Sequence, residues 1–390
     1  MKNIEKGINA LDAEHSKTVV LQPITLDELS RASLTPRTIV EGFLYADVRT
    51  RIAPGGVGKT TLALYEAARL ALGKPVWGKT PPRPIKTCMV SREDGRSILV
   101  ARLREIIKAM DVSERERQQV IANVMIVDLS SEPYRLSCVE KDTVNPDVLA
   151  LERLCEALEP WQPDWLIFDP LVSFGVGESR VNDAEQGLIE AFRILRNRLD
   201  CCVEGIHHSG KANAREGTLD QYSGRGGSAL SDGSRMVVVL QPLEPKDWLK
   251  ETGTHLEPGE TGLIMALPKL SYSKPQDPIF IRRYGWTFSR EVAATRLTSE
   301  QEAEQHIKKL QNFLSAEWLL GARYSKSALD AQAERLNMSR AEIRAAYGAL
   351  EARGLAIYHE IKGKAGSHFE LVSAAADIGE GIEKMPKTLH

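Results

Sequence analysis

The residues with the clearest chemistry lie between Ala53 and Thr61, in the run Ala-Pro-Gly-Gly-Val-Gly-Lys-Thr-Thr. Glycines lack a Cβ, so consecutive backbone N–H groups can turn toward phosphate oxygens at the positive end of a helix. In such a loop Lys59 contacts the β and γ phosphates, and the Thr60 hydroxyl holds Mg²⁺. The predicted phosphate-binding residues are Gly55, Gly56, Val57, Gly58, Lys59, Thr60 and Thr61.

This loop lies where a predicted strand runs into a predicted helix. The β-prone run Ala46–Ile52 precedes it, and helix formers with helical apolar spacing follow in Leu62–Leu70. Ala53 replaces the first glycine of the G-x-x-x-x-G-K-[ST] pattern, which is tolerated if its φ angle is negative. The alternative is a glycine-rich turn that only connects two elements. The order of strand, loop and helix favours phosphate binding, with ATP and Mg²⁺ as the expected ligands.

Two acidic residues at predicted strand ends could complete this site. The apolar run Trp165–Asp169 ends in aspartate, so we expect Asp169 to bind Mg²⁺ through water, with a simple strand-end cap as the alternative. A second predicted strand, Thr87–Ser91, is followed by Glu93 and Asp94. Glu93 is the predicted general base because its side chain can reach a water near the γ-phosphorus. Asp94 is the second candidate for the base. Either acid could instead cap the helix that starts near Arg96.

Another predicted strand ends in His207 and His208. Adjacent residues of an extended chain point to opposite faces, so one metal ion cannot easily bind both histidines. We expect His208 to contact the γ-phosphate and His207 to support it from the core; the alternative is that both satisfy only local hydrogen bonds. The segment after them is basic and glycine-rich. Its residues Lys211, Arg225 and Gly226 are predicted to bind single-stranded DNA, unless the segment is an ordinary flexible loop.

Two further cations, Arg235 and Lys269, lie at later strand borders. A cation in such a place can reach the γ-phosphate of a neighbouring subunit as a finger. Each is therefore a candidate catalytic residue, and an ordinary surface cation is the alternative.

The elements that must position these residues alternate between strand-like and helical patterns from Thr38 onward, which predicts an α/β fold with a mostly parallel sheet. Two later β-prone runs, Gly262–Pro268 and Pro278–Tyr284, are expected to extend this sheet in antiparallel fashion, after a polar insert with turn residues over 243–260. The predicted strands are Val48–Ile52, Thr87–Ser91, Val124–Asp128, Trp165–Asp169, Cys202–His207 and Met236–Leu240; the predicted helices are Lys59–Leu72, Arg96–Met110, Asp147–Leu158 and Asn182–Leu199.

The composition changes after Arg290, and the following segment has the order of a winged helix-turn-helix. Helices are expected at Glu302–Leu314, Ser325–Leu336 and Ser339–Arg353, and a β-hairpin at residues 355–371. Arg340 and Arg344 lie one turn apart on the third helix, and Lys362 and Lys364 mark the wing tip, which suits duplex DNA. Nearby glutamates nearly balance these charges, so a protein partner is the alternative. The predicted domains are an arm at 1–36, with a short helix near Thr25–Leu29, an ATPase domain at 37–290, a winged helix at 298–371 and a flexible tail at 372–390.

The charge balance, the cysteine spacing and the length of the apolar runs limit the class of protein to which this chain can belong. The 390 residues include 51 basic and 53 acidic side chains, so any DNA contact must come from local patches. The five cysteines have no C-x-x-C spacing, which fits reduced thiols. No apolar run approaches the roughly 20 residues that span a bilayer, and the N-terminus lacks a signal sequence, so we expect a cytoplasmic protein.

Several of these motifs together resemble the RepA-type hexameric helicases of broad-host-range plasmids, which belong to the RecA-like family that includes DnaB-type replicative helicases. The motifs are Gly42–Leu44, Ala53–Thr61, Ser91–Asp94, Leu166–Asp169, His207–Lys211 and Gly224–Ser228. The resemblance covers about residues 38–290 and implies a RecA-like P-loop ATPase core that forms a homohexameric ring, with ATP between subunits and single-stranded DNA in the channel. It implies the same roles for Lys59, Thr60, Glu93, Asp169 and His208, and makes Arg235 and Lys269 the finger candidates.

The leading hypothesis is an ATP-driven motor on single-stranded DNA, a replicative helicase of a mobile element that works with replication partner proteins. The second hypothesis is an ATP-switched DNA-binding regulator or initiator, in which the winged helix supplies specificity. A third is a RecA-like recombination or signalling ATPase that does not unwind DNA.

Overall fold

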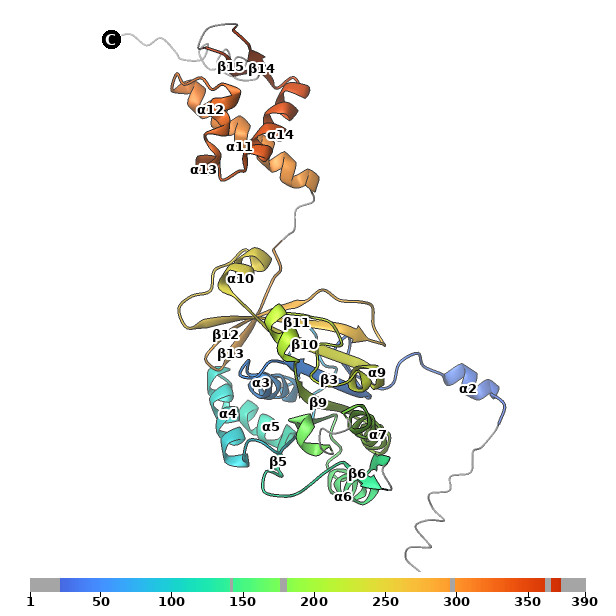
Figure 1. Cartoon of the computed structure of the whole chain (residues 1–390). Coiled ribbons are helices and arrows are strands. Elements are labelled where there is room, and N and C mark those ends of the chain that lie inside the picture. Colours follow the sequence, from blue (N-terminus) through green and yellow to red (C-terminus); the bar gives the residue numbers. More distant parts are fainter. Residues whose placement is uncertain (1–21, 141–142, 176–180, 295–298, 362–365, 373–390) are drawn as a thin grey trace, which may run out of the picture. The chain divides into compact units, whose positions relative to one another are not determined.

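The computed structural model describes residues 22–140, 143–175, 181–294, 299–361 and 366–372 (Figure 1). The chain divides into two compact units, residues 1–294 and 295–390. In the described part of the chain, no helix is both long enough and apolar enough to cross a membrane. The predicted wing tip at Lys362 and Lys364, the predicted tail and most of the N-terminal arm lie outside the described residues.

The first unit is built on a nine-stranded sheet (Figure 1). Six neighbouring strands are parallel, and the three at one edge are antiparallel. In spatial order the strands are β13 (Thr287–Glu291), β12 (Ile279–Tyr284), β11 (Glu260–Leu270), β10 (Met236–Leu243), β3 (Val48–Ala53), β9 (Cys202–His208), β8 (Trp165–Asp169), β4 (Thr87–Ser91) and β5 (Val124–Asp128). All six predicted parallel strands are confirmed, as are the two antiparallel ones. The predicted α/β class and the large, mostly parallel sheet are therefore confirmed.

Helices cover both faces of the sheet. On one face α3 (Lys59–Ala71), α4 (Arg96–Ala109) and α5 (Glu114–Asn123) share a core with the sheet, centred on residues such as Leu64 and Ile167. On the other face α6 (Val148–Leu158), α7 (Val181–Leu199) and the 3₁₀ turn η1 (Leu171–Phe174) pack around Phe168 and Phe192. Alternate residues of each strand therefore enter two different cores, which explains why the parallel strands read as continuous apolar runs.

Several elements differ from the sequence prediction. The polar insert over 243–260 contains a helix, α10 (Pro245–Thr252), with Pro245 in its first turn and Gly253 as a left-handed C-cap. These residues are turn signals in the sequence, but here they begin and end a helix that buries Trp248. Elements that were not predicted are α5, the hairpin of β6 (Ser137–Glu140) and β7 (Thr143–Pro146), the short pair β1 (Thr38–Val40) and β2 (Leu44–Tyr45), α8 (Lys211–Glu216), α9 (Ala229–Gly233) and β13.

The described part of the N-terminal arm contains α2 (Leu26–Arg31), close to the predicted helix. Thr25 and Glu28 form a capping box that satisfies its first backbone N–H groups. None of its residues is buried.

The second unit has its own core, formed by residues such as Leu310, Leu329, Ile343 and Phe369. It contains α11 (Ser299–Leu319), α12 (Lys326–Asp330), α13 (Ala333–Leu336), α14 (Arg340–Ala352) and the hairpin of β14 (Ala356–His359) and β15 (His368–Leu371). The predicted second helix is in fact two short helices, α12 and α13; the first and third helices and the hairpin are confirmed as elements.

Candidate functional site

The predicted phosphate-binding loop joins β3 to α3 at the carboxyl end of the parallel strands. Ala53 is the last residue of β3 and is extended, so alanine is tolerated where the pattern has glycine. Gly56 and Gly58 have φ angles of +78° and +89°, which residues with a Cβ rarely adopt. Gly58 is the N-cap of α3 and has no side-chain cap, so the first N–H groups of this helix are available to an anion.

Four side chains meet where the loop enters α3. Thr60 Oγ1 donates to Asp169 Oδ2 at 2.5 Å, which joins the helix to the end of β8. Lys59 Nζ lies 3.4 Å from the Pro54 carbonyl oxygen and 3.4 Å from His208 Nδ1. Thr60 and Asp169 thus present adjacent oxygen ligands of the kind that Mg²⁺ takes beside substrate phosphates, so the residues present fit that ion. The strand ends predicted to converge here do so.

Burial shapes the protonation of these groups. Burial raises the pKa of Asp169, while the hydrogen bond from Thr60 and the charge of Lys59 oppose the rise. Burial lowers the pKa of Lys59, and the charges of Asp169 and Glu93 oppose this effect. For His208, burial and then the charge of Lys59 lower the pKa, so its imidazole is neutral near pH 7.

The two candidate bases lie in different surroundings. Asp94 accepts from Arg102 Nη1 at 2.6 Å, so an ion pair holds it against α4. Glu93 is exposed and has no ion pair within the described residues, and its charge acts on Lys59, Asp169 and His208. Glu93 therefore remains the predicted base and Asp94 the second candidate, with the Asp94 carboxylate paired to Arg102 on α4.

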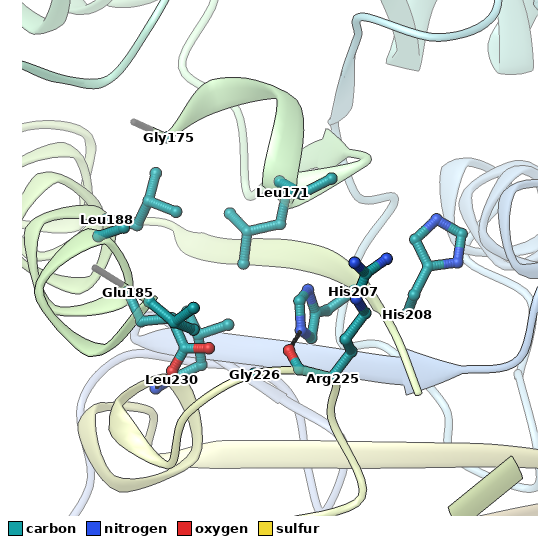
Figure 2. Close-up of a pocket in the computed structure, with 12 residues that line it drawn as sticks. Leu171, Gly175, Glu185, Leu188, His207, His208, Arg225, Gly226 and Leu230 are labelled. Atoms are coloured by element: carbon teal, nitrogen blue, oxygen red, sulfur yellow. Dashed lines mark hydrogen bonds between the residues drawn. The ribbon is translucent and has the colours of Figure 1, made fainter. Parts of the chain in front are cut away.

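The two histidines separate as an extended strand requires. His208 approaches Lys59, whereas His207 is about nine-tenths buried and its Nε2 lies 2.6 Å from the carbonyl oxygen of Arg225, the bond drawn in Figure 2. Burial lowers the pKa of His207. The Arg225 N–H donates in turn to the His208 carbonyl oxygen at 2.8 Å. Both histidines are therefore tied to the glycine-rich segment that follows.

The glycine-rich segment after the two histidines is held by more contacts than its composition indicates. Lys211 begins the short helix α8, and Ser209 pairs with Gly224 in a β-bridge. The side chain of Gln241 donates to the carbonyl oxygens of Asn213 and Thr218. Lys211, Arg225 and Gly226 are exposed, so the predicted DNA-binding residues lie on a segment with an anchored base.

A residue that the sequence did not single out, Glu185 on α7, holds the other end of this segment. Its carboxylate accepts from the N–H groups of Gly227 at 2.9 Å and Leu230 at 3.3 Å. Glu185 lines a cavity of about 170 Å³ together with Leu171, Leu188, Gly226 and others. Figure 2 shows Glu185 and Leu188 on one side of this cavity and His207, His208 and Arg225 on the other. The only sequence signal for Glu185 is an acid on the apolar face of a helix.

Arg235 and Lys269 are remote from the phosphate loop of their own chain. The Arg235 N–H donates to the carbonyl oxygen of Val48, the first residue of β3, whereas the loop follows its last residue. Lys269 pairs with Val237 near the start of β10, and its ammonium donates to the carbonyl oxygens of Ser231 and Asp232. Both cations therefore lie toward the end of the sheet opposite the phosphate loop of their own chain.

In the second unit, Arg340 begins α14 and is exposed. Arg344 is also exposed but is paired with Asp330, whose Oδ2 accepts from Nη2 at 2.7 Å. Of the two predicted DNA-binding arginines of this helix, one is therefore already engaged by an acid.

The sheet, the phosphate loop and the lysine, threonine and aspartate that meet there define a P-loop ATPase, a class whose members bind nucleotide. Residues 15–214 match the sequence profile of a family described as AAA domain, and this match spans more than half of the chain. The protein belongs to this AAA domain family.

Solved structures with similar folds are more distant. A KaiC-like protein from the hyperthermophilic archaeon Pyrococcus horikoshii is 14% identical, with 65% of this chain and 94% of that chain covered and a TM-score of 0.41. The flagellar accessory protein FlaH from Methanocaldococcus jannaschii is 10% identical, with coverages of 65% and 92% and a TM-score of 0.39. A third solved structure, described as an ATPase domain, is 13% identical, with coverages of 71% and 93% and a TM-score of 0.42.

Proposed function

We propose that this protein hydrolyses ATP with Mg²⁺ and uses the reaction to move along single-stranded DNA, as a hexameric, RepA-like replicative helicase. The observation that carries this proposal is the direct connection between the nucleotide site and the basic segment after β9. Lys59 lies 3.4 Å from His208, and the backbone of His208 is hydrogen-bonded to Arg225. A phosphate that draws Lys59 away from His208 thereby acts on the base of the predicted DNA-binding segment.

The residues of the chain divide the chemistry between them. The backbone N–H groups of the loop and Lys59 bind the phosphates, and Thr60 and Asp169 hold Mg²⁺, which when bound neutralises charge on the β and γ phosphates. Glu93 accepts the proton of the attacking water. His208, neutral near pH 7, donates a ring N–H to a γ-phosphate oxygen while that group is present and loses this hydrogen bond when it leaves.

The connection continues through the segment to α7. His207 holds the Arg225 carbonyl oxygen, and Glu185 holds the N–H groups of Gly227 and Leu230. Arg225 therefore lies between two fixed anchors, one at the nucleotide site and one on α7. A movement of the end of β9 shifts Arg225 relative to α7, which is the displacement that a DNA motor requires.

The test is steady-state ATP hydrolysis with no DNA, single-stranded DNA or duplex DNA, with particle mass from light scattering in the presence of Mg²⁺ and nucleotide. We expect stimulation by single strands in a six-subunit particle. Arg225→Ala should abolish the stimulation and leave the basal rate, while Arg198→Ala, an exposed arginine at the end of α7, should change neither. If the rate of ATP hydrolysis does not change when single-stranded DNA is added, and the particle is a monomer or dimer, the motor proposal is wrong.

A second candidate function is an ATP-switched regulator that binds duplex DNA through the second unit. The order of its elements, helices followed by a hairpin, supports a winged helix-turn-helix, and Arg340 is exposed at the start of α14. Tight duplex binding by the full chain that is lost in Arg340→Ala, without stimulation of hydrolysis by single strands, would favour this function over the motor.

A further inference from the structure

One cation beside the phosphate loop has no role in the site described above. Arg283 lies on β12, at the end of the sheet that carries the loop, and pairs with Thr261 across the strands. A Cβ built on Gly58 would lie only 2.5 Å from Arg283 Nη1, so the guanidinium packs directly against the loop residue before Lys59. This contact is possible because residue 58 is glycine.

The position of Arg283 is fixed by its neighbours. Its Nε donates to the carbonyl oxygen of Gly285 at 3.1 Å, and its guanidinium carbon lies 5.5 Å from the centre of the Phe288 ring. Phe288 packs in turn on α3, where the Tyr65 hydroxyl donates to its carbonyl oxygen at 2.8 Å. The strand that carries Arg283 is therefore tied to the helix that begins with Lys59.

Arg283 lacks the ion pairs that its neighbour Arg282 has. Its neighbour Arg282 points to the opposite face and is paired with Glu260 and Glu291. Within the described residues no carboxylate forms an ion pair with Arg283, and burial is the one cause that lowers the pKa of its guanidinium. A partly buried cation without a counter-ion is costly, and an anion that binds beside it offsets part of that cost.

We propose that Arg283 binds the polyphosphate of the nucleotide held by the phosphate loop of its own chain. This inference rests on the proposed nucleotide binding and adds to it a cation from the antiparallel edge of the sheet. The two terminal nitrogens of a guanidinium match two phosphate oxygens, and Nε is already committed to Gly285. Arg283 is thus a binding residue in cis, whereas Arg235 and Lys269 lie toward the opposite end of the sheet from the loop.

The test measures binding of ADP and of inorganic tripolyphosphate to the full-length protein by displacement of a fluorescent ADP analogue, with Mg²⁺ present. Arg283→Met should weaken both ligands by about 10- to 100-fold, the range expected for loss of charge-assisted hydrogen bonds. Arg290→Met is the matched control, because it removes the same charge from the adjacent strand, where Arg290 donates to the Trp77 carbonyl oxygen; its affinities should stay within about twofold.

Each outcome separates the hypotheses. Equal affinities in Arg283→Met and the native protein would overturn the inference, as would a loss for ADP without a loss for tripolyphosphate, which would assign Arg283 to the base or ribose. A native protein that binds neither ligand would instead contradict the proposed function. Thermal unfolding checks that the variants fold. If Arg283→Met does not fold, Arg283→Lys takes its place. This variant keeps the charge but not the paired nitrogens, so it should bind both ligands more weakly than the native protein does.

Discussion

Single residues around the phosphate loop differ in whether the protein already provides them with a partner. Asp94 is held by Arg102 and Thr60 by Asp169, whereas Glu93 is exposed and has no ion pair within the described residues. The Arg102 ion pair directs the Asp94 carboxylate toward α4, whereas the Glu93 side chain is free to turn toward a water beside the γ-phosphate. This difference assigns separate roles to the two adjacent acids.

We expect Glu93→Gln to lower the rate constant of ATP hydrolysis by about 10²- to 10⁴-fold, the contribution typical of a general base. Nucleotide affinity should change little, because Glu93 is not among the groups proposed to bind phosphate. Asp94→Asn should reduce the rate less and should lower thermal stability through loss of the Arg102 ion pair. Single-turnover hydrolysis with a separate binding measurement checks both. If Asp94→Asn lowers the hydrolysis rate more than Glu93→Gln does, Asp94 is the base and this assignment is wrong.

The burial of His207 should make stability depend on pH. Burial lowers its pKa below the ordinary value of 6.5, so the unfolded chain binds the proton more readily than the folded chain. The stability that depends on neutral His207 is therefore complete above that value and is lost as the pH falls through it. His207→Gln, which can still donate to the Arg225 carbonyl oxygen, should show a smaller drop in unfolding midpoint between about pH 7.5 and 5.5 than the native protein. Equal drops in the two proteins would contradict this account.

The sequence was sufficient to predict those site residues that lie at the carboxyl ends of the parallel strands. Lys59, Thr60 and Asp169 meet because the carboxyl ends of neighbouring parallel strands share one edge of a sheet. The roles of Glu185 and Arg283 depend on contacts 42 and more than 200 residues along the chain, with Gly227 and Gly58 respectively. No local sequence pattern predicts a contact between residues so far apart in the chain. The roles of both residues could therefore be recognised only in the structure.

At the scale of elements, a buried cluster of charges joins the phosphate-loop strand to its neighbours. Arg49 and Arg51 of β3 are fully buried, as are Glu204 of β9 and Glu66 of α3. Glu204 contacts Arg49 at 3.0 Å and Arg51 at 2.5 Å, and Arg51 also contacts Glu66 at 2.5 Å. The cluster fixes α3, and with it Lys59, against β3 and β9.

Removal of one charge from this cluster should be strongly destabilising. Glu204→Gln leaves Arg49 without its carboxylate, and we expect the free energy of unfolding to fall by about 3–5 kcal/mol. Glu159→Gln is the control: it makes the same change in the half-exposed pair with Arg198, and its effect should be far smaller. Denaturant unfolding of both variants measures the difference. Similar losses in the two variants would show that the buried cluster has no special role.

Elements were predictable where burial and periodicity agreed. The ends of β4, β5 and β8 match the predicted strands because each is a short apolar run between polar segments. In contrast, α5 is largely exposed and buries only Val120, so its sequence carries little apolar periodicity. The helix α10 was missed for a different reason, since proline and glycine mark helix ends as well as turns.

At the scale of the whole molecule, the chain consists of two units with separate cores. The nucleotide site, its candidate base and the glycine-rich segment all belong to residues 1–294, and the helices and hairpin with Arg340 belong to residues 295–390. Among the described residues, the core around Leu310 and Ile343 is formed by side chains of the second unit itself. Each unit buries its own apolar surface, which is the condition for independent folding.

We therefore expect a chain cut after Ala294 to retain the nucleotide affinity of the full protein, because every proposed phosphate-binding group remains in it. The complementary piece from Thr295 should unfold cooperatively by itself, since its buried residues pack on one another. Nucleotide binding by the first piece and thermal unfolding of the second, each compared with the intact chain, provide the measurement. The Lys59→Ala variant of the first piece controls for binding outside the phosphate loop. If the first piece folds but binds nucleotide much more weakly than the intact chain, the second unit contributes to the site, and the assignment of all phosphate contacts to residues 1–294 is wrong.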